Sequence, residues 1–348
     1  MNLRILLLSH SFAPSVGGIE VNSELFARTF TQAGHQVRVV TWTPDPQDTV
    51  FPFGIIRNPG TLSLLRQFRW ADVIFENNPC LRLGWPNAFF RKPSVIALNT
   101  WVARINGRTG IQDRVKKIWL RQAREVISVS TAVRVRDWPA ARVIGNPYRA
   151  DQFRILQGVI RNKDFVFLGR LVSDKGAEQC VHALYKFLKG NSREKEPVTL
   201  TIVGDGPELP ALKRLVSGLH LEKKVSFTGT LQGEELVACL NAHRFLLVPS
   251  LWEEPFGNVV LEGMACGCIP LVSDGGGLPE AVGQAGLLFR RGDLADLVRC
   301  MQSIYGDGDR REQLLSAARR HLRKHQPDEV TRQYLDRIVL AASQTTGT

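Results

Sequence analysis

Two glutamates, Glu254 and Glu262, flank the start of a predicted helix. A buried strand is expected to end at Pro249, a loop with Pro and Gly follows, and the helix begins near Asn258. Glu254 then lies in the loop and Glu262 about one turn inside the helix, so both carboxylates can face one ligand beside the free N–H groups of the helix N-terminus. A loop carboxylate in this position suits the hydroxyl groups of a sugar, and a helical one suits those of a ribose.

Two cations, Arg170 and Lys175, follow the predicted strand 165–169. They leave the carboxyl end of this strand after Gly169, close enough in sequence to converge on one diphosphate. An Arg binds phosphate oxygens through its planar fork, whereas a Lys acts as a compact charge. The alternative interpretation is a pair of exposed surface cations.

A pair of glycines, Gly17 and Gly18, separates the predicted strand 5–9 from a predicted helix over 20–33. Glycines let the backbone approach a ligand closely, and the helix N-terminus offers unpaired N–H groups with partial positive charge. The turn therefore predicts a second place for phosphate. The alternative is an ordinary strand-to-helix turn, because the pattern is not G-x-G-x-x-G.

The elements that must position these residues alternate between short apolar strands and amphipathic helices. Strands are predicted at 5–9, 36–42, 73–76, 95–99, 126–130 and 142–145, and again at 165–169, 199–204, 225–229, 245–249 and 269–273. This alternation is typical of parallel sheets with helices on both faces. The predicted fold class is α/β, with two doubly wound Rossmann-like domains over residues 1–148 and 149–327. Ligands in such folds bind beyond the carboxyl ends of the strands, so the two domains are expected to face each other across a cleft.

Charge is distributed unevenly along the chain. The net charge is +12, yet residues 1–150 carry 20 Lys and Arg against 9 Asp and Glu, while the remainder carries 25 against 24. The hydrophobic share of 44% and the charged share of 22% are those of a globular protein and exclude a disordered chain. The basic first half predicts an anionic partner, which could be nucleic acid, anionic lipid or a phosphorylated acceptor.

Neither a metal nor a cofactor is expected. The six cysteines are scattered and predicted to be reduced, largely buried thiols: Cys80, Cys180, Cys239, Cys266, Cys268 and Cys300. Asp307 and Asp309 have the D-x-D form of metal-dependent transferases of another fold, but their place between two helical stretches predicts a turn. Apolar residues never run together for the roughly 18 positions that a membrane-spanning helix needs. The apolar start, residues 3–8, is predicted to be a buried strand and no signal peptide.

The segment around Glu254 and Glu262 resembles the E-x(7)-E motif of retaining glycosyltransferases of family 4, among the glycosyl transferases group 1. The resemblance covers most of the chain. Gly17 and Gly18 resemble the glycine loop of that family, and Arg170 and Lys175 match its donor-diphosphate cations. Three further segments also match in order and spacing, at residues 202–207, 227–229 and 275–280.

This resemblance implies the fold usually called GT-B, with a final segment 328–348 whose helix crosses back to the first domain. It implies a nucleotide-sugar donor, in which Glu262 binds the ribose, Glu254 binds sugar hydroxyls near C3 and C4, and the glycine loop closes over the phosphates. The predicted catalytic residues are Arg170, Lys175 and Glu254. The predicted donor-binding residues are Gly17, Gly18, Gly169, Gly204, Phe256, Gly257, Asn258, Val259 and Glu262.

One position departs from the family pattern. Family members commonly place a His after the fourth strand of the first domain, where this chain has Asn99. Asn exchanges hydrogen bonds but does not titrate. His10, Glu20 and Asn99 are assigned to the acceptor side, and the residue at 99 leaves open whether the protein transfers sugars or only binds them.

A basic amphipathic helix is predicted over residues 111–124. One face carries Arg114, Lys117, Arg121 and Arg124, and the other carries Ile111, Val115, Ile118 and Trp119. Such a helix can lie on an anionic membrane, or pack on the core with a solvated cationic face. Nucleic acid is not expected as a partner, because no known binding motif or aromatic stacking platform accompanies the charge. The expected location is the cytoplasm, with peripheral attachment at the inner membrane face as the open alternative.

The sequence thus predicts a glycosyltransferase that uses a UDP-, GDP- or ADP-sugar and a glycan, lipid-linked or small-molecule acceptor. Arg170 and Lys175 would stabilise the negative charge of the departing diphosphate. The resemblance implies retention of anomeric configuration, no metal, and a place in polysaccharide or glycolipid biosynthesis. A glycosidase fits less well, since its retaining carboxylates stand about 5 Å apart across the cleaved bond. A silent nucleotide-sugar-binding protein, and a phosphorylase or epimerase on the same fold, remain as alternatives.

Overall fold

The computed structural model describes residues 2–15, 17–102, 110–190 and 198–343. The chain divides into two compact units, which we call unit 1 (Met1–Pro147 with Pro327–Thr348) and unit 2 (Tyr148–Gln326). The predicted boundaries at 148/149 and 327/328 lie one residue from these divisions. Residue 16 of the glycine turn and residues 344–348 of the predicted last segment lie outside the described residues.

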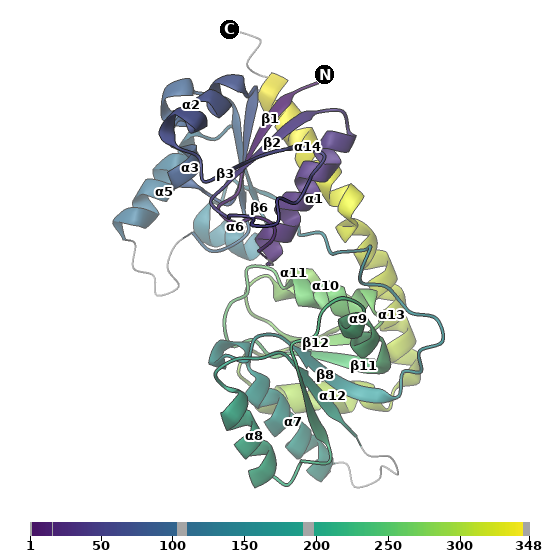
Figure 1. The fold of residues 1–348 in the computed structure, drawn as a ribbon. Helices are drawn as coiled ribbons and strands as arrows, with labels where there is room; N and C mark the ends of the chain where they lie inside the picture. The colour runs from purple at the N-terminus through teal and green to yellow at the C-terminus, as the bar shows by residue number, and fades with distance from the viewer. Residues whose placement is uncertain (1, 16, 103–109, 191–197, 344–348) are drawn as a thin grey trace. The chain divides into compact units, whose positions relative to one another are not determined.

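Unit 1 is built on a seven-stranded sheet with the order β3-β2-β1-β4-β5-β6-β7 (Figure 1). The strands are β1 (Arg4–Leu8), β2 (Gln36–Thr41), β3 (Gly54–Arg57), β4 (Val73–Asn77), β5 (Ser94–Leu98), β6 (Glu125–Ser128) and β7 (Arg142–Val143). Every pair is parallel, so the carboxyl ends of the strands meet at one edge. The central strands are fully buried, as expected for apolar runs covered on both faces.

The helices of unit 1 cover both faces of this sheet. They are α1 (Gly18–Gln32), α2 (Thr61–Trp70), α3 (Leu81–Gly84), α4 (Asn87–Phe90), α5 (Ile111–Gln122), α6 (Thr131–Asp137) and α14 (Pro327–Ser343). The last helix of the described chain thus returns to the sheet formed by the first residues. Tyr334 of α14 packs on Phe26 of α1, with ring centroids 4.6 Å apart, and both contact Phe75 of β4.

Unit 2 contains a six-stranded parallel sheet with the order β10-β9-β8-β11-β12-β13. The strands are β8 (Lys163–Leu168), β9 (Leu200–Val203), β10 (Val225–Gly229), β11 (His243–Val248), β12 (Ile269–Ser273) and β13 (Leu287–Phe289). Strand β8 pairs with β11 although 74 residues lie between them, so the loops that follow these two strands become neighbours.

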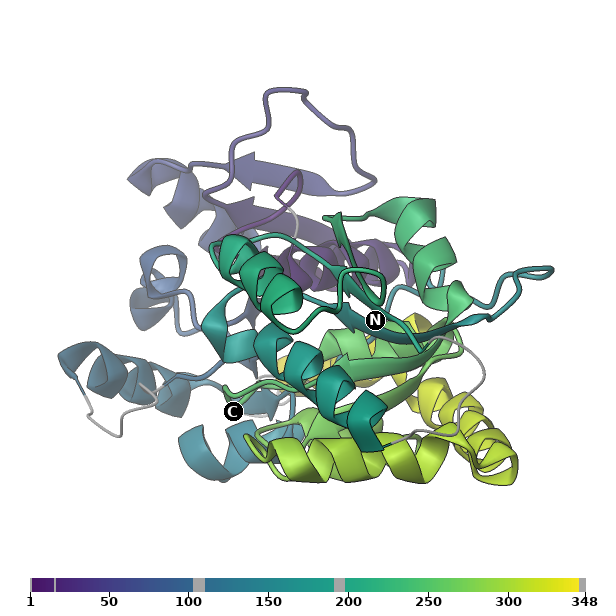
Figure 2. The ribbon, with the colours of Figure 1, turned by 90° about the horizontal axis from the view of Figure 1, so that it is seen from below.

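Helices enclose the sheet of unit 2 as well. They are η1 (Ser173–Lys175), α7 (Ala177–Gly190), α8 (Leu209–Gly218), α9 (Gly233–Ala242), α10 (Asn258–Ala265), α11 (Leu278–Val282), α12 (Leu294–Tyr305), α13 (Gly308–Leu322) and η2 (Arg323–His325). Figure 2 shows α7 and α12 side by side, where Phe187 meets Tyr305 with ring centroids 5.3 Å apart. The two sheets and their helices confirm the predicted α/β class with two Rossmann-like units.

The sequence missed two edge strands, β3 and β13. They are four and three residues long, and an edge strand needs only one hydrogen-bonded neighbour, so neither shows the long apolar run of a central strand. None of the helices among the described residues is long and apolar enough to cross a membrane.

Candidate active site

The loops after β8 and β11 form the most strongly organised polar site of unit 2. Lys175 of η1 donates a hydrogen bond to Oε1 of Glu254 and forms an ion pair with it. Ser250 Oγ donates to the same Oε1 at 2.8 Å. Both contacts use one carboxylate oxygen, so Oε2 of this buried glutamate is left for hydroxyl groups of a ligand.

Backbone hydrogen bonds also join the loop after β11 to the loop after β8. The amides of Leu251 and Trp252 donate to the carbonyl oxygen of Asp174, at 2.8 and 3.2 Å. The Lys175 ammonium also lies 5.9 Å from the ring centre of Trp252. A cation over an aromatic face is attracted by the ring quadrupole, which adds to the ion pair. The charged pair is therefore fixed from both sides before any ligand arrives.

The other predicted cation, Arg170, follows β8 at the same edge of the sheet but is exposed. It has no acidic partner within ion-pair distance among the described residues. The structure thus brings Lys175 and Glu254 together directly, while Arg170 remains an exposed cation at the sheet end.

Gly169 and Gly204 follow the neighbouring strands β8 and β9. Gly204 has φ +138°, and a Cβ on it would overlap the carbonyl oxygen of Gly169. The Gly204 amide donates to Gly229 at 2.8 Å, and the Gly169 amide donates to Val203 at 3.0 Å. The two predicted glycines therefore serve close backbone packing beside Arg170.

Helix α10 presents its N-terminus next to Glu254. Gly257 is its N-cap with φ +114°, a left-handed conformation that other residues adopt only with strain. Asn258 and Val259 follow in its first turn, at the positive end of the helix dipole. The Phe256 side chain is buried and packs at a tilt against His325, with ring centres 5.5 Å apart, so only its backbone can face a ligand.

Glu262 lies in the second turn of α10 and is half-buried. Burial raises the pKa of its carboxyl group to about 7, and the positive charge of Arg149 acts in the opposite direction. Its carboxylate receives no hydrogen bond from the described residues. A half-buried carboxylate without protein donors is available to accept hydrogen bonds from a ligand, such as ribose hydroxyls.

In unit 1 the carboxyl ends of the strands carry a network of neutral groups. Asn99 Nδ2 donates to Asn77 Oδ1 at 2.6 Å, and its backbone amide donates to Asn78 Oδ1 at 2.8 Å. Asn77 Nδ2 in turn donates to Ser23 Oγ at 2.6 Å and to the Ile19 carbonyl oxygen at 3.1 Å. Asn99 is therefore linked through Asn77 to the first turn of α1.

The remaining candidates of unit 1 lie in the loop after β1 and at the start of α1. Strand β1 ends at Leu8, one residue before the predicted end, and His10 lies in the following bend, with its side chain exposed. Gly17 is the N-cap of α1 and Gly18 its first residue. The Glu20 carboxylate folds back over Gly17 and would overlap a Cβ there. A carboxylate thus already occupies the N-terminus of α1 that the sequence assigned to phosphate.

Sequence reasoning missed Ser250, Trp252 and Arg149 in unit 2, and Ser23 and Asn77 in unit 1. Ser250 and Asn77 stand at the carboxyl ends of strands, the one signal that could have identified them. The described residues contain no group of three or more His, Cys, Asp or Glu side chains arranged for a metal ion. Asp307 caps α13 by accepting from the Arg310 amide at 2.9 Å, as expected for a turn.

The comparisons with known proteins agree with this arrangement. Residues 151–321 match the family described as Glycosyl transferases group 1. The chain is 26% identical to sulfoquinovosyl transferase SQD2 of Arabidopsis thaliana over 81% of its own length and 59% of that protein. It is 27% identical to glycogen synthase of Mycobacterium tuberculosis over 69% and 55%. The chain thus spans little more than half the length of these relatives.

Solved structures match nearly the whole chain. Anabaena Alr3699/HepE, in complex with UDP and glucose, superposes with a TM-score of 0.80 at 21% identity, over 97% of this chain and 100% of that one. The sucrose-phosphate synthase tll1590 of Thermosynechococcus elongatus superposes with a TM-score of 0.78 at 22% identity, over 98% and 100%. These likenesses confirm the predicted two-domain Rossmann-like fold.

Proposed function

We propose that this chain transfers a sugar from a nucleotide-diphosphate sugar to an acceptor, and that unit 2 binds the donor. The observation that supports this most directly is the Lys175–Glu254 pair beside the N-terminus of α10. A fixed cation and the positive end of a helix suit a diphosphate, while a carboxylate with one open oxygen suits sugar hydroxyls. The family match over residues 151–321 covers this same site.

The proposed chemistry follows from these groups. When the sugar–phosphate bond breaks, negative charge develops on the departing diphosphate. Lys175, Arg170 and the first amides of α10 would stabilise that charge in a preformed site. Glu254 would orient the sugar through Oε2, and Glu262 would accept hydrogen bonds from the ribose. We infer retention of anomeric configuration, as in family 4, with the leaving phosphate taking the acceptor proton and no metal required.

The donor nucleotide and the acceptor belong to the same proposal. HepE was solved with UDP, which makes a UDP-sugar the first donor to test, followed by GDP- and ADP-sugars. We assign the acceptor, a glycan, lipid-linked or small molecule, to unit 1, where Asn99 and its network offer neutral hydrogen-bonding groups.

Attachment to an anionic membrane is a finer part of the proposal, supported by α5. Ile111, Val115 and Ile118 on this helix are 82%, 44% and 56% exposed, beside the cations Arg114 and Arg121. The predicted apolar face is wrong in one respect. Trp119 is buried, and its indole donates to Glu76 at 2.8 Å, so it anchors the helix to the core.

Sedimentation with vesicles of phosphatidylglycerol and phosphatidylcholine tests this attachment. Replacing Ile111 and Ile118 by Ser should abolish sedimentation, whereas the same change at the exposed Val135 of α6 should not. Failure of the unmodified protein to sediment would exclude the attachment.

Thermal stabilisation by a panel of UDP-, GDP- and ADP-sugars tests the donor site. A ligand that binds only the folded state raises the melting temperature. One nucleotide sugar should stabilise the protein, and Glu262→Ala should remove that shift. Glu178→Ala, on the surface of α7, should keep it. If no nucleotide sugar stabilises the protein, the donor site is wrongly assigned.

Transfer itself needs a second measurement. Release of nucleoside diphosphate only in the presence of an acceptor identifies a transferase and excludes a phosphorylase or an epimerase. Donor binding without release across a broad acceptor panel would instead identify a silent nucleotide-sugar-binding protein, the alternative that Asn99 raises.

A further inference from the structure

A hollow of about 670 Å³ opens on unit 1, at the end of α5. It lies where α5 and α6 end and where β6 and β7 begin. Asn77 and Asn99 stand at the opposite edge of the same sheet, beyond the carboxyl ends of β4 and β5. The hollow is therefore separate from the candidate acceptor side.

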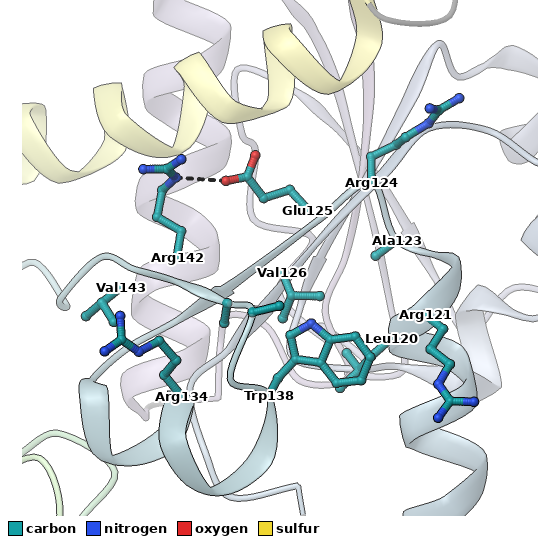
Figure 3. A pocket seen from close by; sticks show the side chains of 12 residues that line it. Leu120, Arg121, Ala123, Arg124, Glu125, Val126, Arg134, Trp138, Arg142 and Val143 are labelled. Carbon is teal, nitrogen blue, oxygen red and sulfur yellow. Dashed lines mark hydrogen bonds and ion pairs between the residues drawn. The ribbon is translucent and has the colours of Figure 1, made fainter.

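Four arginines line this hollow together with one tryptophan. Figure 3 shows Arg121, Arg124, Arg134 and Arg142 around the rim, with the indole of Trp138 among them. Their guanidinium groups lie on different sides of the opening and do not meet at one point. A ligand that satisfied several of them would carry several anionic groups spaced along its length.

The one acidic side chain of the lining is already used. Glu125 accepts from Arg142 Nε at 2.9 Å and from Arg337 of α14, whose Nη2 lies 2.6 Å from Oε2. Arg121, Arg124 and Arg134 have no acidic partner within ion-pair distance among the described residues. These three cations therefore keep their charge available at the rim.

Helix stabilisation explains the presence of only two of the four arginines. Arg121 lies in the last turn of α5 and Arg134 in the last turn of α6, where a cation stabilises the negative end of the helix dipole. That effect does not explain why Arg142 stands on β7, or why a half-exposed tryptophan lies between the cations.

We propose that this hollow binds an acidic oligosaccharide, at a place separate from the candidate donor and acceptor sides. Arginine forks bind carboxylate, sulfate or phosphate groups in two parallel hydrogen bonds. The flat apolar face of Trp138 suits the C–H face of a sugar ring, which a point cation cannot recognise. A chain of sugars with regularly spaced anionic groups satisfies both features of the lining. This proposal rests on unit 1 alone and does not depend on the proposed transfer.

Isothermal titration of the full chain with a chondroitin sulfate tetrasaccharide, which carries carboxylate and sulfate groups, tests the site. We expect saturable binding that excess UDP, GDP and ADP do not displace. Arg124→Gln with Arg134→Gln should lower the affinity by about tenfold or more, through loss of two charge-assisted contacts. Trp138→Leu should also lower it, while leaving the number of charges unchanged.

Matched controls separate a built site from general attraction to a basic protein. Arg290→Gln with Arg319→Gln removes the same charge from unit 2 and should leave the affinity unchanged. Neutral maltotetraose and inorganic tripolyphosphate should each bind more weakly than the acidic tetrasaccharide. The melting temperature of each variant without ligand shows whether it is folded.

Several outcomes would overturn the proposal. They are no binding by the unmodified protein, equal binding of tripolyphosphate, an equal loss in the unit 2 control, or displacement by the nucleotides. Binding to phosphatidylglycerol vesicles that requires Arg124 and Arg134, without saccharide binding, would assign the hollow to a membrane surface and would equally overturn it.

Discussion

Among the described residues, each unit contains one glutamate whose pKa burial raises to about 7, and the two differ in what surrounds them. Glu76 of β4 accepts hydrogen bonds from the Trp119 indole at 2.8 Å and from the Cys80 amide at 2.9 Å. Glu262 of α10 receives none from the described residues, and Arg149 is the charge that lowers its pKa. Glu76 therefore accepts hydrogen bonds from buried donors of unit 1, while the carboxylate of Glu262 is available to a ligand.

The carboxyl ends of the two sheets differ in the same sense. In unit 1, Ser9 and Ser23 exchange a hydrogen bond of 2.8 Å and continue through Asn77 to Asn99, so the groups are neutral and satisfy one another. In unit 2 the corresponding edge holds the ion pair of Lys175 and Glu254. The same fold therefore supports a sheet edge with neutral groups and a sheet edge with charged groups. The strands fix where the residues that follow them lie, and the types of those residues decide the chemistry of the edge.

The largest expected effect is the loss of charge at the edge of unit 2. Lys175→Met should lower the rate of sugar transfer by about 10²–10³-fold, as expected for one preorganised group that stabilises developing charge. The rate of acceptor-dependent nucleoside diphosphate release measures it. Lys186→Met, on the exposed face of α7, should retain full activity. Full activity of Lys175→Met would show that sugar transfer does not need this charge at the sheet edge of unit 2.

The next effect concerns the close backbone packing of Gly204 against Gly169 in unit 2. Gly204→Ala should lower the free energy of unfolding by about 2 kcal/mol or more, because the backbone has φ +138° and a Cβ would overlap the Gly169 carbonyl. Gly218→Ala at the end of α8, where a Cβ meets nothing within 4 Å, should have little effect. Urea denaturation followed by circular dichroism compares the two, and equal midpoints would show that the loop relaxes around a methyl group.

A third experiment uses the two glutamates directly. In the proposed role the ionised form of Glu262 binds the ribose hydroxyls, so nucleotide affinity should fall by up to about tenfold per pH unit below pH 7. Glu262→Gln should bind weakly at every pH. Glu76→Gln should keep the pH dependence of the unmodified protein, because its carboxyl group touches only protein. If Glu76→Gln, and not Glu262→Gln, removed the pH dependence of nucleotide affinity, then Glu76 and not Glu262 would be the group that binds the nucleotide.

The stability of the ligand-free protein should respond with the opposite sign. A carboxyl group whose folded pKa of about 7 exceeds its ordinary value of 4.5 binds protons more tightly when folded. Its contribution to the free energy of unfolding is therefore largest at low pH and is lost as the pH rises from about 4.5 to about 7. Glu262→Gln should show a smaller decline, because Glu76 keeps its own contribution, as measured by denaturation at several pH values.

The smallest expected effect lies at the neutral edge of unit 1. Asn99→Ala should raise the KM for the acceptor by a few-fold to about tenfold, since it removes one neutral hydrogen bond to Asn77. The melting-temperature shift with the donor should stay the same, because no charged donor contact changes. Loss of the donor shift in this variant would contradict the assignment of Asn99 to the acceptor.

Much of unit 2 follows from local sequence. Helix α10 begins and ends where predicted, at Asn258 and Ala265, and β10 and β12 also have their predicted bounds. A periodic pattern of apolar residues and a Gly N-cap depend on only a few neighbouring residues, so the sequence shows them without knowledge of the tertiary structure. The edge strands and the burial of Trp119 were missed, because a neighbouring strand and a distant carboxylate decide them.

The sequence by itself determined the alternation of strands and helices, the motif with Glu254 and Glu262, and the excess of positive charge before residue 150. The tertiary structure alone decided which of these groups meet. Strand order placed the loop of Lys175 beside that of Glu254. It also distributed four arginines around a hollow at the amino ends of β6 and β7. The physical reason is that residue type is local, whereas ion pairing and desolvation depend on neighbours far away in the chain.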